Sequence, residues 1–96
     1  LSTKGKLVVD SGAALALKNQ NRSLLAAGIR QTEGDFRRGD IVDIYDPDGY
    51  PLGCGITNYS SSDIGAIKGT HSGKIAALLG HDYGSEVVHR NNLAVF

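Results

Sequence analysis

One short stretch of the chain has a composition close to that of a phosphate-binding loop. Residues 69–75 read Gly-Thr-His-Ser-Gly-Lys-Ile. A P-loop needs four residues between its glycines, and a Ser or Thr after the lysine to reach magnesium. Here three residues separate Gly69 from Gly73, and Ile75 follows Lys74. We therefore interpret this stretch as a turn between two helices.

The histidines and the single cysteine are the side chains that could bind a metal ion or act as a nucleophile. His71, His81 and His89 are not spaced four residues apart on one helix, and only Cys54 could add a sulfur ligand. A nucleophilic thiol needs a nearby base and an accessible, electropositive setting. Cys54 instead lies among glycines and apolar residues, which favours a buried core thiol. The polar run 89–92 favours a β-turn held by its Asn side chains, with a functional cluster as the alternative.

A β-hairpin is the clearest element that could position such groups. Residues 41–45 alternate apolar and polar side chains, as a half-buried strand does. In the turn that follows, Pro47 presets the backbone and Gly49 accepts a positive φ. The returning strand is predicted to turn an apolar face, made of Leu52, Cys54 and Ile56, toward the core. Its other face carries Gly53 and Gly55, so another segment can pack closely there.

Capping residues predict three short helices. The first follows Asp10 and has residues 13–17 as its body, with Leu17 turned inward. The second and third end at glycines in the left-handed conformation. The second is predicted to begin at Ser60 and to end at Gly69, and the third to begin at Ser72 and to end at Gly80.

The remaining strands are short, and a tight connection precedes the hairpin. Phe36 is the single apolar residue of that connection, between two glycines, and is predicted to lie in the core. The other predicted strands cover residues 7–9, 28–33, 86–89 and 93–96. The whole pattern predicts a mainly β domain of about six strands with short helices.

Length and composition predict one small domain. A chain of 96 residues buries roughly 60 to 70% of its unfolded surface, which is enough for one core. Thirteen glycines fit a turn-rich β structure. There is no run of membrane-spanning length and no secretory signal, and the lone cysteine fits a reducing compartment, so we expect a cytoplasmic protein without a membrane partner. Because the chain starts at Leu1 and contains no Met, we expect it to be a fragment of a longer polypeptide.

The charge is neutral overall but unevenly distributed. Residues 1–32 carry five basic side chains against one acidic, a net charge of +4, and residues 33–48 carry six acidic against two basic, a net of −4. Nucleic-acid binders usually have a basic excess, because phosphate neutralisation supplies much of their affinity. We therefore interpret most of these charges as solvated, with a local basic face as the alternative.

Several segments resemble a known family in their order and spacing. They are residues 5–13, 23–29, 33–36, 38–42, 46–49, 58–61 and 87–93. Together they are similar to a PUA domain and, more narrowly, to the C-terminal PUA domain of bacterial glutamate 5-kinases. The resemblance covers almost the whole chain.

This resemblance implies a single PUA pseudo-barrel over residues 1–96 that has no catalytic role of its own. In the family, a separate kinase domain transfers phosphate from ATP, with magnesium, to the γ-carboxylate of glutamate, which opens proline biosynthesis and is inhibited by proline. The implied role is regulatory or one of interaction, with the chain's own kinase domain or homo-oligomer partners. No cofactor is expected in this fragment.

The alternative implied by the resemblance is weak binding of structured RNA. In RNA-binding PUA domains a glycine-containing loop, the helix before it and the strand after it form the RNA face, aided by the last strand. Gly28 matches the loop glycine, and the nearest basic residues are Lys18, Arg22 and Arg30. A purely structural interpretation is also open, in which Gly28 supplies a turn φ and the core contains Leu24, Leu25 and Ile29.

Overall fold

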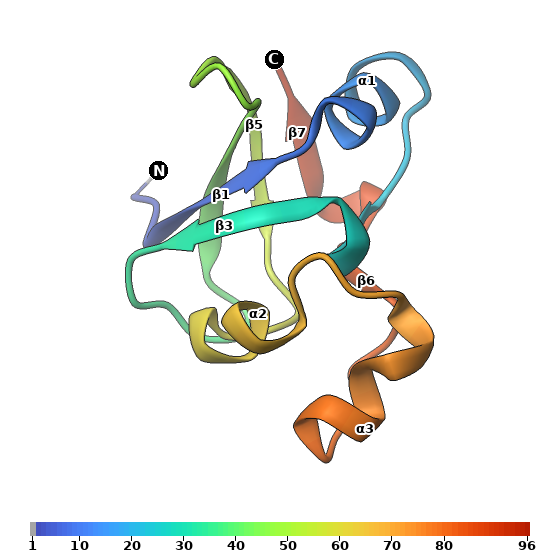
Figure 1. Ribbon diagram of the computed structural model, residues 1–96. Helices are drawn as coiled ribbons and strands as arrows, with labels where there is room; N and C mark the ends of the chain where they lie inside the picture. The colour runs from blue at the N-terminus through green and yellow to red at the C-terminus, as the bar shows by residue number, and fades with distance from the viewer. Residues whose placement is uncertain (1) are drawn as a thin grey trace.

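The computed structural model describes residues 2–96, and its strands form two sheets (Figure 1). The strands are β1 (Gly5–Val9), β2 (Leu24–Leu25), β3 (Ile29–Glu33), β4 (Ile41–Tyr45), β5 (Pro51–Ile56), β6 (Glu86–Val88) and β7 (Leu93–Val95). The helices are α1 (Ser11–Asn19), α2 (Ser61–Ile67) and α3 (Ile75–Leu79), with the 3-10 turns η1 (Ala26–Gly28), η2 (Ser72–Lys74) and η3 (Arg90–Asn92). A mainly β fold with short helices is confirmed, with seven strands among residues 2–96 where about six were predicted.

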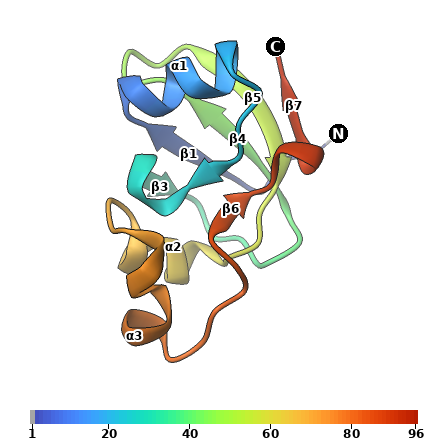
Figure 2. The same ribbon diagram turned by 90° about the vertical axis from the view of Figure 1, so that its right-hand side faces the viewer.

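The larger sheet has the strand order β3-β1-β4-β5-β7, and β2 pairs with β6 in a separate two-stranded sheet. Only the β1–β4 pairing of the described strands is parallel. Parallel neighbours need a long crossover, and here α1, β2, η1 and β3 supply it. Both ribbon views place α1 at the opposite end of the molecule from α2 and α3 (Figures 1 and 2).

The predicted starts of the first two helices and the predicted ends of the second and third are confirmed by local hydrogen bonds and backbone angles. The predicted start of the third helix at Ser72 is wrong, because Ser72 opens the 3-10 turn η2 and α3 begins at Ile75. The Asp10 carboxylate accepts the N–H of Ala13 at 2.7 Å, and the Ser60 hydroxyl accepts the N–H of Asp63 at 3.1 Å. Each bond satisfies an N–H that has no partner inside the helix. The chain leaves α2 and α3 through glycines with φ of +76° and +78°, a conformation that costs glycine little.

The core lies between the larger sheet, α1 and α2. On β1 and β4 alternate residues point inward, as the pleat of a strand requires. Phe36 is 2% exposed, which confirms its predicted place in the core. The other large buried side chains include Leu7, Val9, Leu17, Val42, Ile44, Tyr59, Ile64 and Ile67.

The inward face of β5 is its glycine face, so the predicted orientation of this strand is wrong. Gly53 pairs with Ile44 and Gly55 pairs with Val42. Directly paired residues point to the same side of a sheet, and both β4 partners are fully buried. A Cβ added to Gly55 would lie 2.5 Å from a methyl carbon of Val88, so the core has no room for a side chain there.

The three residues predicted to face the core from β5 have different surroundings. Leu52 is buried, beside an irregularity in the β4–β5 pairing. Cys54 is half-buried, and Ile56 is 40% exposed on the outer side of the sheet. The hydrophobic pattern was therefore misleading, because the strand presents its small residues to the elements that approach most closely. The turn before β5 is confirmed, with Gly49 at a φ of +89°.

Candidate nucleic-acid interface

A polar groove lies between the segment after α1 and the end of β6. Its volume is about 470 Å³. It is lined by Gln20, Asn21, Arg22, Ser23, Leu25, Glu86, His89 and Arg90. Arg22 Nε donates to the side-chain oxygen of Gln20 at 3.0 Å, and the N–H of Arg90 donates to the Ser23 hydroxyl at 2.8 Å. The second bond joins the two walls, so it brings both arginines to one groove.

An apolar pocket of about 320 Å³ continues from this groove, between α1 and η1. The two depressions share Arg22, Ser23 and Leu25. The pocket is otherwise lined mainly by small and aliphatic residues, namely Gly12, Ala13, Ala16, Leu17, Leu24, Ala27 and Gly28. Leu25 is 41% exposed, so the expectation that it belongs to the core is wrong, whereas Leu24 and Ile29 are buried as expected. The combined surface can accept an apolar group beside a negatively charged one.

Gly28 is required at this surface by packing and not by its backbone angle. Its φ is not positive, so the interpretation that it supplies a special turn angle is wrong. A Cβ at this position would lie only 2.7 Å from the Cβ of Ala13 on α1. Real Cβ atoms essentially never approach that closely. The glycine therefore lets η1 lie directly against α1, and this contact forms one wall of the apolar pocket.

The four residues predicted from the sequence are only partly brought together. Arg22 lines both depressions and Gly28 lines the apolar one. Lys18 on α1 and Arg30 on β3 are exposed but line neither of them. The structure thus divides the basic residues into one that faces the groove and two that do not.

Arg90 and His89 are groove residues that were not selected from the sequence. The run 89–92 was interpreted as a turn, and η3 confirms the turn. Its stabilising side chain is His89, whose Nδ1 accepts the N–H of Asn91 at 3.1 Å, and not an Asn as predicted. One signal in the sequence could have indicated these two residues. The resemblance implied that the last strand contributes to the RNA face, and residues 89–92 immediately precede that strand.

The groove has modest charge and no Phe, Tyr or Trp side chain. Arg22 and Arg90 face it together with Glu86, which leaves a net charge of +1 when His89 is neutral. None of the six aromatic residues of the chain lines the groove or the apolar pocket. Bases bound by proteins usually stack on aromatic or arginine side chains. Any stacking here would have to use the guanidinium groups or the imidazole ring of His89.

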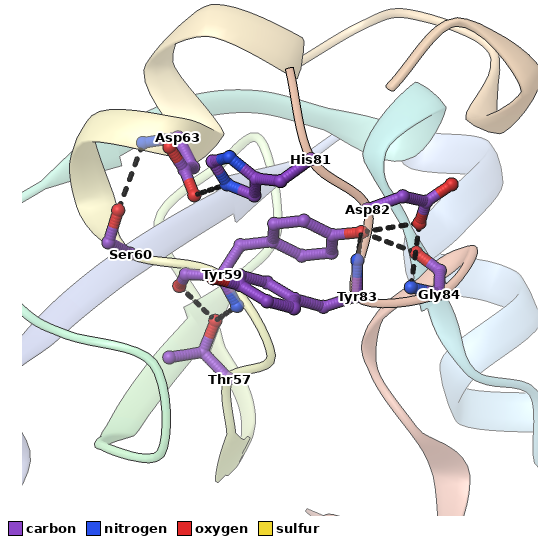
Figure 3. A network of polar contacts seen from close by, with 8 residues as sticks. All are labelled: Thr57, Tyr59, Ser60, Asp63, His81, Asp82, Tyr83 and Gly84. Atoms are coloured by element: carbon purple, nitrogen blue, oxygen red, sulfur yellow. Dashed lines mark hydrogen bonds and ion pairs between the residues drawn. The ribbon is translucent and has the colours of Figure 1, made fainter. Parts of the chain in front are cut away.

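A second polar cluster lies away from this groove, around the buried side chain of Tyr59 (Figure 3). The Tyr59 hydroxyl accepts the N–H of Tyr83 at 2.8 Å and lies 2.6 Å from the carbonyl oxygen of Gly84. Nearby, His81 Nε2 lies 2.8 Å from a carboxylate oxygen of Asp63 in the first turn of α2. These bonds hold the segment after α3 against α2. The bonds of Tyr59 are structural, since its side chain is inaccessible to a ligand.

Burial raises the pKa of the Tyr59 phenol above its ordinary value. The hydrogen bond from the Tyr83 backbone opposes this shift, and the nearby Asp82 carboxylate adds to it. The phenol is protonated at neutral pH in any case, and the raised pKa lets it keep its proton, and so donate a hydrogen bond, at a higher pH than an ordinary tyrosine.

The remaining segments considered as phosphate-binding, metal-binding or membrane-spanning can also be assessed in the structure. Residues 69–74 form a turn in which His71 Nδ1 accepts the N–H of Gly73 at 3.0 Å, and this confirms the helix-to-helix connection. Within residues 2–96, no group of three or more His, Cys, Asp or Glu side chains is arranged to hold a metal ion. None of the helices described for residues 2–96 has the length and apolar character needed to cross a membrane.

Comparison with known proteins gives both a family and a set of longer relatives. The family model for the PUA domain matches residues 5–79. A glutamate 5-kinase of Dehalococcoides mccartyi (strain CBDB1) is 58% identical over 95 residues, which are 99% of this chain and 26% of the relative. That of Deinococcus radiodurans is 50% identical over 91 residues, which are 95% of this chain and 25% of the relative. The chain thus spans about a quarter of these relatives and matches their C-terminal region.

Solved structures share the fold. A PUA domain from Aeropyrum pernix K1, solved as a tartrate complex, has a TM-score of 0.66 and 28% identity, covering 90% of this chain and 41% of that one. A chain of the archaeal box H/ACA sRNP Nop10-Cbf5 complex has a TM-score of 0.61 over 97% of this chain and 23% of that one, at 15% identity. The second likeness concerns the fold alone. Because the family model matches most of the chain and these structures share its architecture, the chain belongs to the PUA domain family.

Proposed function

We propose that this chain is the noncatalytic C-terminal module of a glutamate 5-kinase, with a regulatory or interaction role. The observation that carries the proposal is the identity of 58% along 99% of the chain, confined to about a quarter of the relative. On this proposal a separate kinase domain binds ATP, magnesium and glutamate and performs the first step of proline biosynthesis in the cytoplasm. The module contacts that kinase domain or other copies of the protein.

The proposal is tested by placing this chain in the context of its relative. In a chimaera, residues 2–96 replace the matching C-terminal region of the Dehalococcoides mccartyi enzyme. Its formation of glutamyl phosphate, its inhibition by proline and its oligomeric mass are compared with those of the same kinase truncated before the module. We expect the module to change the inhibition or the mass. If the chimaera and the truncated kinase agree in all three measurements, the proposed role is wrong.

The second candidate is weak RNA binding, which the paired arginines of the groove favour. Arg22 and Arg90 come from distant parts of the chain but face the same groove, next to an apolar pocket. Two or three phosphate contacts would give a slope of log K against log salt of about −1.4 to −2.7, depending on whether the contacted RNA is single-stranded or paired. The affinity should be low, because the groove also holds Glu86 and lacks Phe, Tyr and Trp side chains.

Two double variants with the same charge change test this candidate. Arg22→Ala with Arg90→Ala removes the groove arginines, and Lys18→Ala with Arg30→Ala removes two exposed charges outside the groove. With a structured RNA at low salt, the groove variant should bind more weakly and its salt slope should flatten by about 1.4 to 1.8. The slope of the control variant should stay close to that of the wild type. Equal losses in both variants would indicate nonspecific attraction. No wild-type binding in dilute buffer would exclude the RNA role.

A further inference from the structure

The outer face of the larger sheet carries an uncharged patch around β5. Ile41 pairs directly with Ile56, and Cys54 pairs directly with Ala94, so each pair lies on one side of the sheet. A groove of about 280 Å³ lies here. We call this surface the outer sheet patch; its lining residues are Ile41, Cys54, Gly55, Ile56, Asn91, Asn92, Leu93 and Ala94.

The composition of the outer sheet patch is typical of a protein contact. None of its lining residues is charged, although 21% of the chain is. The charged side chain of Asp43 lies beside the patch on the same face, because Asp43 pairs directly with Cys54. Its centre contains the half-buried Cys54 and the exposed Ile56, and Asn91 and Asn92 supply polar groups at one side. Contacts between proteins commonly combine an apolar centre, depleted in charge, with a polar rim. An RNA backbone would find no basic side chain among these residues.

The first described residues of the chain are attached at the border of this patch. The hydroxyl of Thr3 donates to a carboxylate oxygen of Asp43 at 2.7 Å, and the N–H of Lys4 donates to the carbonyl oxygen of Ile41 at 2.8 Å. Asp43 pairs directly with Cys54, so its side chain lies on the same side of the sheet as the patch. Any polypeptide joined before residue 2 would therefore start next to this surface.

We propose that the outer sheet patch is the surface on which the kinase domain packs, and this inference rests on the function proposed above. The kinase domain is favoured over a second copy of the chain, because the attachment of Thr3 and Lys4 holds a preceding domain beside the patch. A domain joined by a short tether acts at an effective concentration of about millimolar. An intrinsic Kd of about 0.1 mM would then keep the patch covered about ten times as often as open. Contacts between domains of one chain resemble transient protein–protein interfaces in size and polarity.

Alkylation of Cys54 measures whether the patch is covered. The rate is followed by mass spectrometry of the peptide that contains Cys54, in the chimaera described above and in the isolated chain. We expect alkylation about tenfold slower in the chimaera, because a covered thiol reacts only when the domains separate. A control cysteine at the exposed position 76, introduced as Ala76→Cys on α3, should react at the same rate in both proteins.

A charged substitution tests whether the protection comes from docking at this surface. Ile56→Lys should restore fast alkylation of Cys54 in the chimaera and leave the isolated chain folded, since the Ile56 side chain already reaches solvent. The matched control is Leu78→Lys on α3, where the leucine is 50% exposed, and it should leave the protection intact. Thermal unfolding of each variant in the isolated chain verifies that it folds.

The outcomes separate this inference from the proposed function. Equal alkylation of Cys54 in the chimaera and the isolated chain overturns the docking surface, even if the module alters proline inhibition. Protection that appears in the isolated chain and grows with its concentration also overturns it, because a second copy then covers the patch. Protection in the chimaera alone, removed by Ile56→Lys, supports the inference, whether or not the module changes the activity of the kinase.

Discussion

The contact between Gly28 and Ala13 predicts a pair of substitutions that are harmful singly and compensate each other. In Gly28→Ala the new methyl group would lie 2.7 Å from the Cβ of Ala13, well inside ordinary carbon contact. Overpacking of this kind costs about 1–3 kcal/mol. Alanine also lowers the conformational entropy of the unfolded chain, which offsets about 0.4–1 kcal/mol of this cost. We expect a net loss of up to about 2.6 kcal/mol in the free energy of unfolding, and of about 1.3 kcal/mol at the middle of these ranges.

Ala13→Gly removes the opposing methyl group from α1. Alone it should cost about 1 kcal/mol, because glycine lowers helix propensity. In the double variant the methyl group introduced at position 28 can occupy the space vacated at position 13. The two losses should therefore not add, and the coupling energy should be about 1–2 kcal/mol in favour of the double variant.

Urea unfolding of the four proteins measures this coupling. For a domain of this size, a loss of 1 kcal/mol also lowers the melting temperature by about 4–8 °C, so thermal unfolding gives a second readout. If the two losses add to within about 0.5 kcal/mol, the α1–η1 contact does not carry the energy assigned to it. A Gly28→Ala variant more stable than the wild type would refute the packing argument outright.

Three further predictions concern stability. Gly65→Ala should raise the free energy of unfolding by about 0.5–1 kcal/mol in urea, since its Cβ would meet open space on α2, and a loss would contradict this. Ile44→Ala should cost about 2–5 kcal/mol and Ile56→Ala less than about 1 in the same assay; equal losses would mean that the observed strand orientation is wrong. Because the pKa of Tyr59 is raised, the folded state keeps its proton above pH about 10 while the unfolded state loses it, so wild-type stability should fall there. The stability advantage of the wild type over Tyr59→Phe should therefore narrow above that pH in unfolding titrations, and a widening gap would contradict the sign of the shift.

Local signals predicted the hairpin turn and most of the helix ends correctly. The turn before β5 is held by Asp46, whose carboxylate accepts the N–H groups of Asp48 and Tyr50, both at 2.9 Å. The caps at Asp10 and Ser60 likewise join residues three positions apart. Interactions over so few residues depend on side-chain type and spacing, which can be read directly from the chain.

The orientation of β5 could not be read in the same way. Its alternation of apolar residues with Gly53 and Gly55 is compatible with either face pointing inward. The glycine face is the buried one because Val88 and Leu93, more than thirty residues further along, approach it closely. The same holds for Gly28, whose need for a small residue comes from Ala13 on another element.

The sequence alone determined the mainly β class, the hairpin turn, the helix caps and the resemblance to PUA domains, because each rests on local pattern and spacing. Only the tertiary structure decided which basic residues share a groove. The bond from Arg90 to Ser23 joins residues 67 positions apart and brings Arg90 to the same groove as Arg22, whereas Lys18 and Arg30 line neither depression. Such contacts depend on how strands and helices pack, since packing sets the distance between residues that the chain order leaves far apart.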